Sequence, residues 1–127
     1  MRLLLTLPLL IAACADETVS GYADPDATYR LTHIDDRAFA AMATVSFPEK
    51  GIARGNGPCN QWSAKQTAPY PWLSLEQAAV TERACPDLAA EQTFFDTLFA
   101  MTLAEVQGAT LILSNDDGTE MTFTTAP

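Results

Sequence analysis

The fold class follows from residues 109–124, which have the sequence ATLILSNDDGTEMTFT. Apolar and polar residues alternate with a period of two on both sides of Asp117-Gly118, as expected when each strand buries one face of a sheet. Aspartate followed by glycine is a typical hairpin turn, because glycine readily adopts positive φ. We therefore predict an antiparallel hairpin whose buried face carries Leu111, Leu113, Met121 and Phe123.

Shorter segments upstream of this hairpin show similar strand patterns. The alternation predicts that Tyr29, Leu31 and His33 share one face of the first strand. Proline and glycine at residues 48–51 indicate a turn between two later strands. Strands are predicted at residues 29–33, 41–47, 52–55, 70–75 and 77–81.

One segment has helical spacing. Asp87 can cap a helix that runs to about Met101, and Pro86 suits a chain that enters it from an extended segment. Several short strands and a single amphipathic helix indicate a mainly β fold, α+β by strict count, with a curved antiparallel sheet and the helix packed on it. The apolar face of the helix should hold Leu88, Phe94, Phe95, Leu98 and Phe99.

The first 14 residues predict export. Residues 3–11 form an apolar run that is too short to span a bilayer, which needs about 20 residues. The run ends in Ile11-Ala12-Ala13-Cys14, which resembles the lipobox of bacterial lipoproteins. The resemblance implies that residues 1–13 are a lipoprotein signal peptide and that Cys14 is acylated, for example with palmitate. Plain secretion and an uncleaved anchor are the alternatives.

The segment after Cys14 is small and acidic. Residues 14–28 are therefore predicted to be a lipidated cysteine followed by a flexible tether with a reach of about 20 Å. Residues 29–127 would then form the folded domain. Ala15 directly after Cys14 favours the outer membrane over the inner one, by resemblance to enterobacterial sorting, with the domain facing the periplasm.

The chain carries 16 acidic residues against 7 Lys and Arg, a formal charge of −9. Nucleic acid is disfavoured, since phosphate binding needs clustered cations. The acids are scattered, which is typical of a solvated surface, although such a surface could also attract a basic protein partner. After removal of the signal peptide the chain suffices for one core, and we expect a monomer.

Cys59 and Cys85 remain as a pair once Cys14 is assigned to lipid. A disulfide between them would close a loop of about 27 residues and stabilise the fold by about 3.5 kcal/mol on the chain-entropy model. Free buried thiols and a reactive thiol are the alternatives. Two cysteines and one distant histidine are too few for a structural zinc site, so we expect no metal and no cofactor.

The motifs around these cysteines resemble a known family. Gly55-x-x-x-Cys59-Asn60 is followed by Thr81-x-x-Ala84-Cys85-Pro86, Glu91-x-x-Phe94, Leu111-x-Leu113 and Phe123. In order and separation these motifs are similar to those of the META domain, the family of the heat-shock lipoprotein HslJ. The resemblance implies a partly closed, barrel-like sheet of lipocalin-like topology with one helix, found in envelope proteins. It implies no known catalytic activity.

Glu91 falls near the apolar face of the predicted helix. A half-buried carboxylate needs hydrogen-bond donors, and Asn60, Thr81 or Arg83 could supply them. We predict that Glu91 locks the helix onto the corner that begins at Gly55, which is a structural role.

Trp62, Tyr70 and Trp72 form an aromatic stretch interrupted by prolines. They could fill the core of a small barrel, or they could line a groove that binds a peptide or a glycan. Their exposure decides between these two interpretations.

No catalytic constellation is visible, and we expect no enzyme. His33 is the single histidine and is best explained as a strand residue, although pairing with a Cys59 thiol stays open. The acid pairs Asp35-Asp36 and Asp116-Asp117 do not supply the six or more oxygens that calcium requires, and they are typical turn residues.

These observations predict a non-catalytic envelope lipoprotein domain in stress tolerance or cell-envelope maintenance, as the resemblance implies. The alternative is a binding or inhibitor module for a basic envelope protein or enzyme, by analogy with small lipoproteins that inhibit basic lysozymes.

Overall fold

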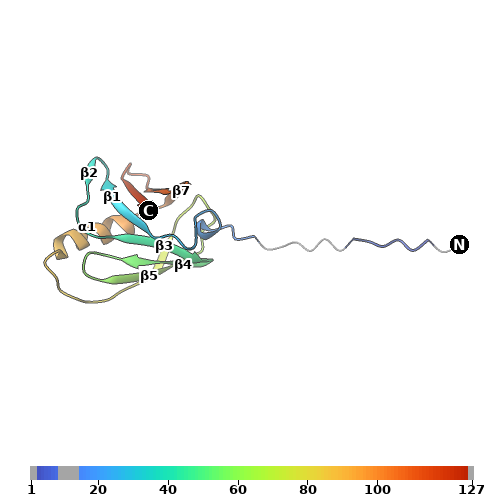
Figure 1. Cartoon of the computed structure of the whole chain (residues 1–127), viewed down its shortest axis with the longest axis horizontal. Coiled ribbons are helices and arrows are strands. Elements are labelled where there is room, and N and C mark those ends of the chain that lie inside the picture. The colour runs from blue at the N-terminus through green and yellow to red at the C-terminus, as the bar shows by residue number, and fades with distance from the viewer. Residues whose placement is uncertain (1–2, 9–14, 126–127) are drawn as a thin grey trace.

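The computed structural model describes residues 3–8 and 15–125 (Figure 1), and Cys14, the predicted lipidation site, lies outside them. Within the described residues no helix is long and apolar enough to cross a membrane. Their elements are η1 (Val19–Gly21), β1 (Tyr29–Ile34), β2 (Arg37–Ala38), β3 (Thr44–Glu49), β4 (Gly51–Asn56), β5 (Gln61–Gln66), β6 (Leu75–Val80), α1 (Leu88–Leu98), β7 (Leu103–Gln107), β8 (Thr110–Ser114) and β9 (Glu120–Thr125).

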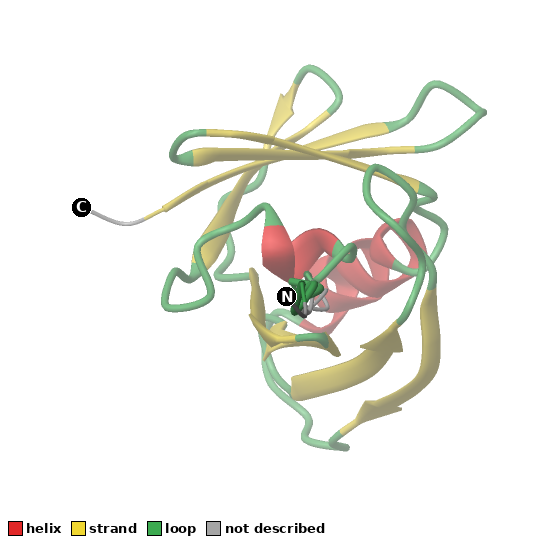
Figure 2. Ribbon diagram, turned by 90° about the vertical axis from the view of Figure 1, so that its right-hand side faces the viewer, coloured by secondary structure: helices red, strands yellow, loops and turns green. Residues whose placement is uncertain are grey.

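The strands form one antiparallel sheet in the order β6-β5-β4-β3-β1-β9-β8-β7, and β2 pairs with β1. The sheet curls into a half-barrel, with strands on both sides of α1 (Figure 2). This mainly β, lipocalin-like curved sheet with one helix is the predicted fold. The C-terminal hairpin has the predicted buried face, in which Leu111 pairs with Phe123 and Leu113 pairs with Met121.

The core lies between the concave side of the sheet and α1. Phe94 and Leu98 of the helix are fully buried there, as are the four apolar residues of the C-terminal hairpin. β3 buries Val45 and Phe47, as the alternation predicts. Apolar side chains that alternate along β3, β8 and β9 therefore pack against a single helix stripe.

The helix differs from its prediction at its N-terminus. Asp87 precedes the helix, but its side chain makes no capping hydrogen bond. Leu88 was expected on the apolar face but is 47% exposed, because the buried positions of the helix begin at Glu91.

The strand predicted at residues 70–75 is wrong. This segment is a turn whose second half runs beside the edge strand β7. Leu73 N–H donates to the Thr102 carbonyl oxygen at 2.9 Å, and Ala104 N–H donates to the Pro71 carbonyl oxygen at 2.8 Å. The turn thereby covers part of an edge that would otherwise offer unpaired backbone groups.

Residues 16–23, predicted as part of a flexible tether, pack on the domain instead. Val19 is fully buried in the core. The Glu17 carbonyl oxygen accepts a hydrogen bond from Tyr70 N–H at 2.7 Å, and the ring of Tyr22 stacks on that of Tyr70 with centroids 4.1 Å apart. This segment contains a single turn of 3-10 helix, which places one valine in the core. One buried residue gives no periodic pattern in the sequence, so the packing could not be predicted.

Candidate functional site

The corner between β4 and β5 is organised by the buried side chain of Asn60. Its Oδ1 accepts hydrogen bonds from Thr81 Oγ1 at 3.0 Å and from Arg83 N–H at 2.6 Å. Its Nδ2 donates to the Arg83 carbonyl oxygen at 3.1 Å and to Glu91 Oε1. An asparagine side chain has two donor hydrogens and two acceptor lone pairs, so all four are used. Asn60 therefore connects the corner both to the chain after β6 and to the helix.

Glu91 lies buried in the first turn of α1. Its Oε2 accepts the backbone N–H groups of Cys59 at 2.7 Å and Asn60 at 2.8 Å. Of the three donors expected from the sequence, Asn60 contacts Glu91 directly, whereas Thr81 and Arg83 bond to Asn60. Charge-assisted bonds to a carboxylate at a helix N-terminus are among the stronger hydrogen bonds in proteins.

Two glycines allow the close approach that the corner requires. A Cβ at Gly55 would lie 2.0 Å from the Thr44 carbonyl oxygen, which also accepts the Trp62 Nε1 hydrogen bond at 3.2 Å. A Cβ at Gly57 would lie 2.8 Å from Glu91 Oε2. Neither position can carry a side chain without moving its neighbour.

The predicted disulfide between Cys59 and Cys85 is present, with the two Cα atoms 5.6 Å apart. It joins the corner to the segment that leads into α1. Because the Cys59 sulfur is engaged in this bond, it cannot act as a thiol nucleophile paired with His33.

A surface groove of about 590 Å³ crosses the outer face of β3 to β6. Its walls include Ser46, Arg54 and Ser63, which alternate along the strands with core residues and so point outward. A second hollow of about 320 Å³ lies at the corner. The two share Asn56, Gln61 and Thr81, and we call them together the outer groove.

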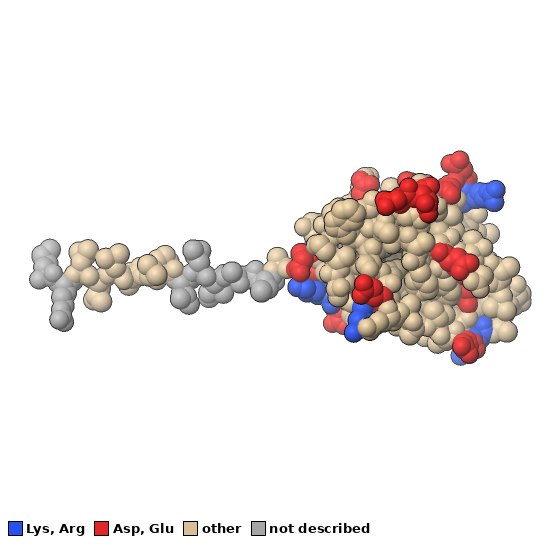
Figure 3. All heavy atoms as spheres, turned by 180° about the vertical axis from the view of Figure 1, so that it is seen from behind, with Lys and Arg blue, Asp and Glu red and all other residues tan. Residues whose placement is uncertain are grey.

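The charge of the outer groove differs from that of the chain. Arg54 and Arg83 line it, among hydroxyl, amide and a few apolar side chains, and no Asp or Glu of the described residues does. Acidic side chains outnumber basic ones on the face drawn in Figure 3. A guanidinium group presents several N–H donors that match carboxylate and phosphate oxygens. The outer groove therefore suits a ligand with anionic oxygens and further hydrogen-bonding groups.

The three aromatic residues singled out in the sequence do not form one surface. Trp62 is 3% exposed and packs edge-on against Phe99, with ring centroids 6.1 Å apart. Tyr70 stacks on Tyr22, and its hydroxyl oxygen accepts Val106 N–H at 3.1 Å. Trp72, by contrast, is 56% exposed.

His33 does not share the inward face of Tyr29 and Leu31, because the register between β1 and β9 shifts between Leu31 and His33. It is exposed, and its Nδ1 lies 3.1 Å from Thr32 Oγ1.

The two acid pairs lie in turns at one end of the sheet. Asp35 N–H donates to the Glu120 carbonyl oxygen at 2.7 Å, and Glu120 N–H donates to Asp35 Oδ1 at 2.9 Å. Asp116 and Asp117 occupy the turn before β9, so the two hydrogen bonds between Asp35 and Glu120 bring the two acidic turns to the same end. Nowhere in the described residues do three or more ligating side chains gather in a way that could hold a metal ion.

The outer groove was not identified from the sequence, in part because β5, which supplies Gln61, Trp62 and Ser63 to its lining, was not predicted. Its inward positions are Trp62, Ala64 and Gln66, and a small residue and an amide do not register as an apolar stripe. The alternation of Trp62 and Ala64 with the polar residues Gln61, Ser63 and Lys65 is the weak sequence signal that could have identified this strand.

A half-barrel with one internal helix and a disulfide-bonded corner defines a small lipocalin-like β domain. The family model of the META domain matches residues 24–127, and the chain belongs to this family. No curated protein matches the chain.

Two solved structures share the fold. An NMR structure of a protein from Burkholderia xenovorans is 21% identical, with a TM-score of 0.61, and the match covers 80% of this chain and 82% of that one. A second NMR structure is 18% identical, with a TM-score of 0.59 and coverage of 80% and 94%. At this identity the likeness shows the fold alone.

Proposed function

We propose that this chain is a lipid-anchored domain of the bacterial cell envelope that binds an anionic ligand in the outer groove and catalyses no reaction. The charge of the groove carries the proposal. Arg54 and Arg83 line it without any carboxylate of the described residues, in a chain of net charge −9. Such a separation of charge favours anionic groups at the groove and repels them elsewhere.

Two observations support the envelope as the location. The lipobox-like segment ending at Cys14 supports attachment to a membrane, for which we propose the outer membrane and its periplasmic face. The Cys59–Cys85 disulfide suits an oxidising compartment. A monomeric domain that holds an anionic component of the envelope would serve cell-envelope maintenance or stress tolerance.

The groove is tested with a charged and an uncharged sugar. Amide NMR shifts of Gln61 and Thr81 are followed while glucuronate or glucose is added. Glucuronate should shift them and glucose should not, and Arg54→Gln should weaken glucuronate binding about tenfold, the effect of one charge-assisted hydrogen bond. The matched control is Arg37→Gln on β2, outside the groove. Equal responses to both sugars, or equal losses in both variants, would contradict an anion-binding groove.

The anchor is tested separately in cells. Labelled palmitate should be incorporated into the wild type, and Cys14→Ser should abolish the label and release the protein from the membrane fraction. A wild-type chain without acyl groups would rule out lipid attachment and would leave the groove experiment unaffected.

The alternative ligand is a basic envelope protein, which the overall charge of −9 would attract. Its binding surface would have to be acidic, so the arginines of the outer groove argue against that site. Co-purification of a cationic enzyme that survives Arg54→Gln would favour this alternative.

A further inference from the structure

We propose that one end of the domain rests directly on the bilayer, with Trp72 and Tyr22 in the lipid headgroup region. This seating surface consists of residues 16–23, Lys50 and the turn at residues 68–73. The inference rests on the proposed attachment through Cys14. It assigns a membrane contact to the two exposed aromatic rings that neither the core nor the outer groove uses.

Very little free chain separates Cys14 from the folded domain. Only Ala15 separates Cys14 from Asp16, and consecutive Cα atoms are about 3.8 Å apart. An acylated Cys14 therefore lies within about 8 Å of the packed segment. The flexible tether of about 20 Å that composition predicts does not exist, since residues 16–23 are folded against the domain.

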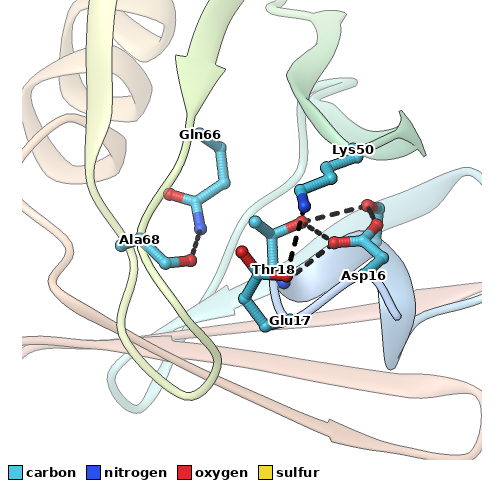
Figure 4. A network of polar contacts seen from close by, with 7 residues as sticks. Asp16, Glu17, Thr18, Lys50, Gln66 and Ala68 are labelled. Atoms are coloured by element: carbon cyan, nitrogen blue, oxygen red, sulfur yellow. Dashed lines mark hydrogen bonds and ion pairs between the residues drawn. The ribbon is translucent and has the colours of Figure 1, made fainter. Parts of the chain in front are cut away.

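The packing of this segment begins at Asp16 itself. Figure 4 shows its carboxylate turned back onto the segment: Oδ1 accepts Thr18 N–H at 2.9 Å and Thr18 Oγ1 at 2.6 Å, and Oδ2 accepts the Ser20 hydroxyl. The carboxylate of Glu17 forms an ion pair of 3.2 Å with Lys50, which lies in the turn between β3 and β4. The folded segment therefore begins two residues after Cys14.

Trp72 is exposed on a turn that hydrogen bonds of a buried side chain hold in place. The buried amide of Gln66 holds the turn, because Nε2 donates to the Ala68 carbonyl oxygen at 3.0 Å and Oε1 accepts Ser74 N–H at 2.8 Å. Leu73, the next residue, is 3% exposed, whereas Trp72 is 56% exposed and Tyr22 is 57% exposed. Tryptophan and tyrosine are the residues most enriched at membrane–water interfaces, since each combines an apolar ring with a polar group.

The charge of this end selects the lipid. Asp16 and Glu17 lie on it with Lys50, a net charge of one acid, so anionic headgroups are repelled. Zwitterionic lipids avoid this repulsion. In this orientation α1 and the corner, which lie at the opposite end of the domain from η1 and the turn between β3 and β4 (Figure 1), face away from the bilayer.

Fluorescence quenching tests the seating without relying on acylation in cells. Since Cys59 and Cys85 form the disulfide, the chain beginning at Cys14 can be coupled through the Cys14 thiol to maleimide-bearing vesicles of zwitterionic lipid. Brominated lipid should lower the tryptophan emission by about half in the wild type. The effect should vanish in Trp72→Phe, in which only buried Trp62 emits.

A length variant separates seating from simple proximity. Ten Gly and Ser residues inserted between Ala15 and Asp16 keep the same attachment but let the domain leave the surface, and quenching should persist if aromatic contacts hold it there. Quenching that is equal in the wild type and in Trp72→Phe, or that is lost on insertion, would overturn the inference. Neither result would bear on the lipid anchor, which the palmitate labelling tests separately.

Discussion

The two ends of this domain are held by different chemistry. At the corner end, a disulfide and a buried carboxylate join β4, β5 and α1, and every hydrogen-bonding position of Asn60 is used. At the N-terminal end, one buried valine, a pair of stacked tyrosines and an exposed ion pair hold residues 16–23. The corner end should therefore open last, and the N-terminal end first.

This difference matches the role proposed for each end. The outer groove reaches the corner, where a fixed backbone keeps its lining residues in place. The N-terminal end lies next to the expected attachment point, where weaker packing allows small adjustments of the domain against a membrane. The following experiments test whether the two ends differ in this way.

Removing the disulfide should have the largest effect. Cys59→Ala with Cys85→Ala should lower the free energy of unfolding by about 3.5 kcal/mol, because the unfolded chain regains the entropy of an open loop. Urea denaturation measures the loss. Amide exchange within residues 16–23 should change only through global unfolding. A loss below about 1 kcal/mol would show that the hydrogen bonds alone hold the corner.

Glu91→Gln should come next, with a loss of about 1 to 3 kcal/mol. Glutamine has one acceptor oxygen, so its NH₂ group would face either the backbone donors of Cys59 and Asn60 or the Asn60 Nδ2 donor. The control is Glu82→Gln, which makes the same change of charge at an exposed position. Equal melting temperatures for the two variants would remove the locking role of Glu91.

Val19→Ala should cost about 1.5 kcal/mol, since two buried methyl groups are lost. Because this end opens locally, the loss should appear as about tenfold faster amide exchange at Tyr22 and Ala23, whose N–H groups both donate to the Val19 carbonyl oxygen. Val80→Ala, at a position that is 38% exposed, serves as the control. If exchange at the corner speeds up equally, the two ends form one cooperative unit.

Protonation of Asp16 should produce the smallest effect, and it concerns the N-terminal end. Burial raises the pKa of Asp16, but the hydrogen bonds from Ser20 and Thr18 outweigh it and hold this pKa below its usual value of 3.8. A lowered pKa in the folded state means that the carboxylate stabilises the packed segment above pH 3.8 and that this contribution is lost as the pH falls through the folded value.

NMR shifts of Thr18 and Ser20 should therefore move toward those of an unpacked segment only below pH 3.8. Asp16→Asn should remove this pH dependence. The same response in Asp16→Asn would assign the transition to another group, such as Glu17, whose pKa is lowered by its own backbone N–H and by Lys50.

Some parts of this molecule follow from local sequence alone. Leu111, Leu113, Met121 and Phe123 alternate around a turn that needs glycine, so the hairpin and its buried face could be predicted. The disulfide pairing was predictable because only two cysteines remain after Cys14. In each case a few residues and one general structural rule are enough for the prediction.

Other parts depend on partners that are distant in the chain. Val19 is buried because the sheet offers it a site, and nothing in the small acidic segment around it shows this. Trp62 and Trp72 are the same residue type ten positions apart in the sequence, yet one lies in the core and the other is exposed to solvent. The period of apolar residues indicates which face of a strand is buried. A turn or a chain terminus has no such period, so whether its side chains are buried is decided only when the sheet packs around its helix.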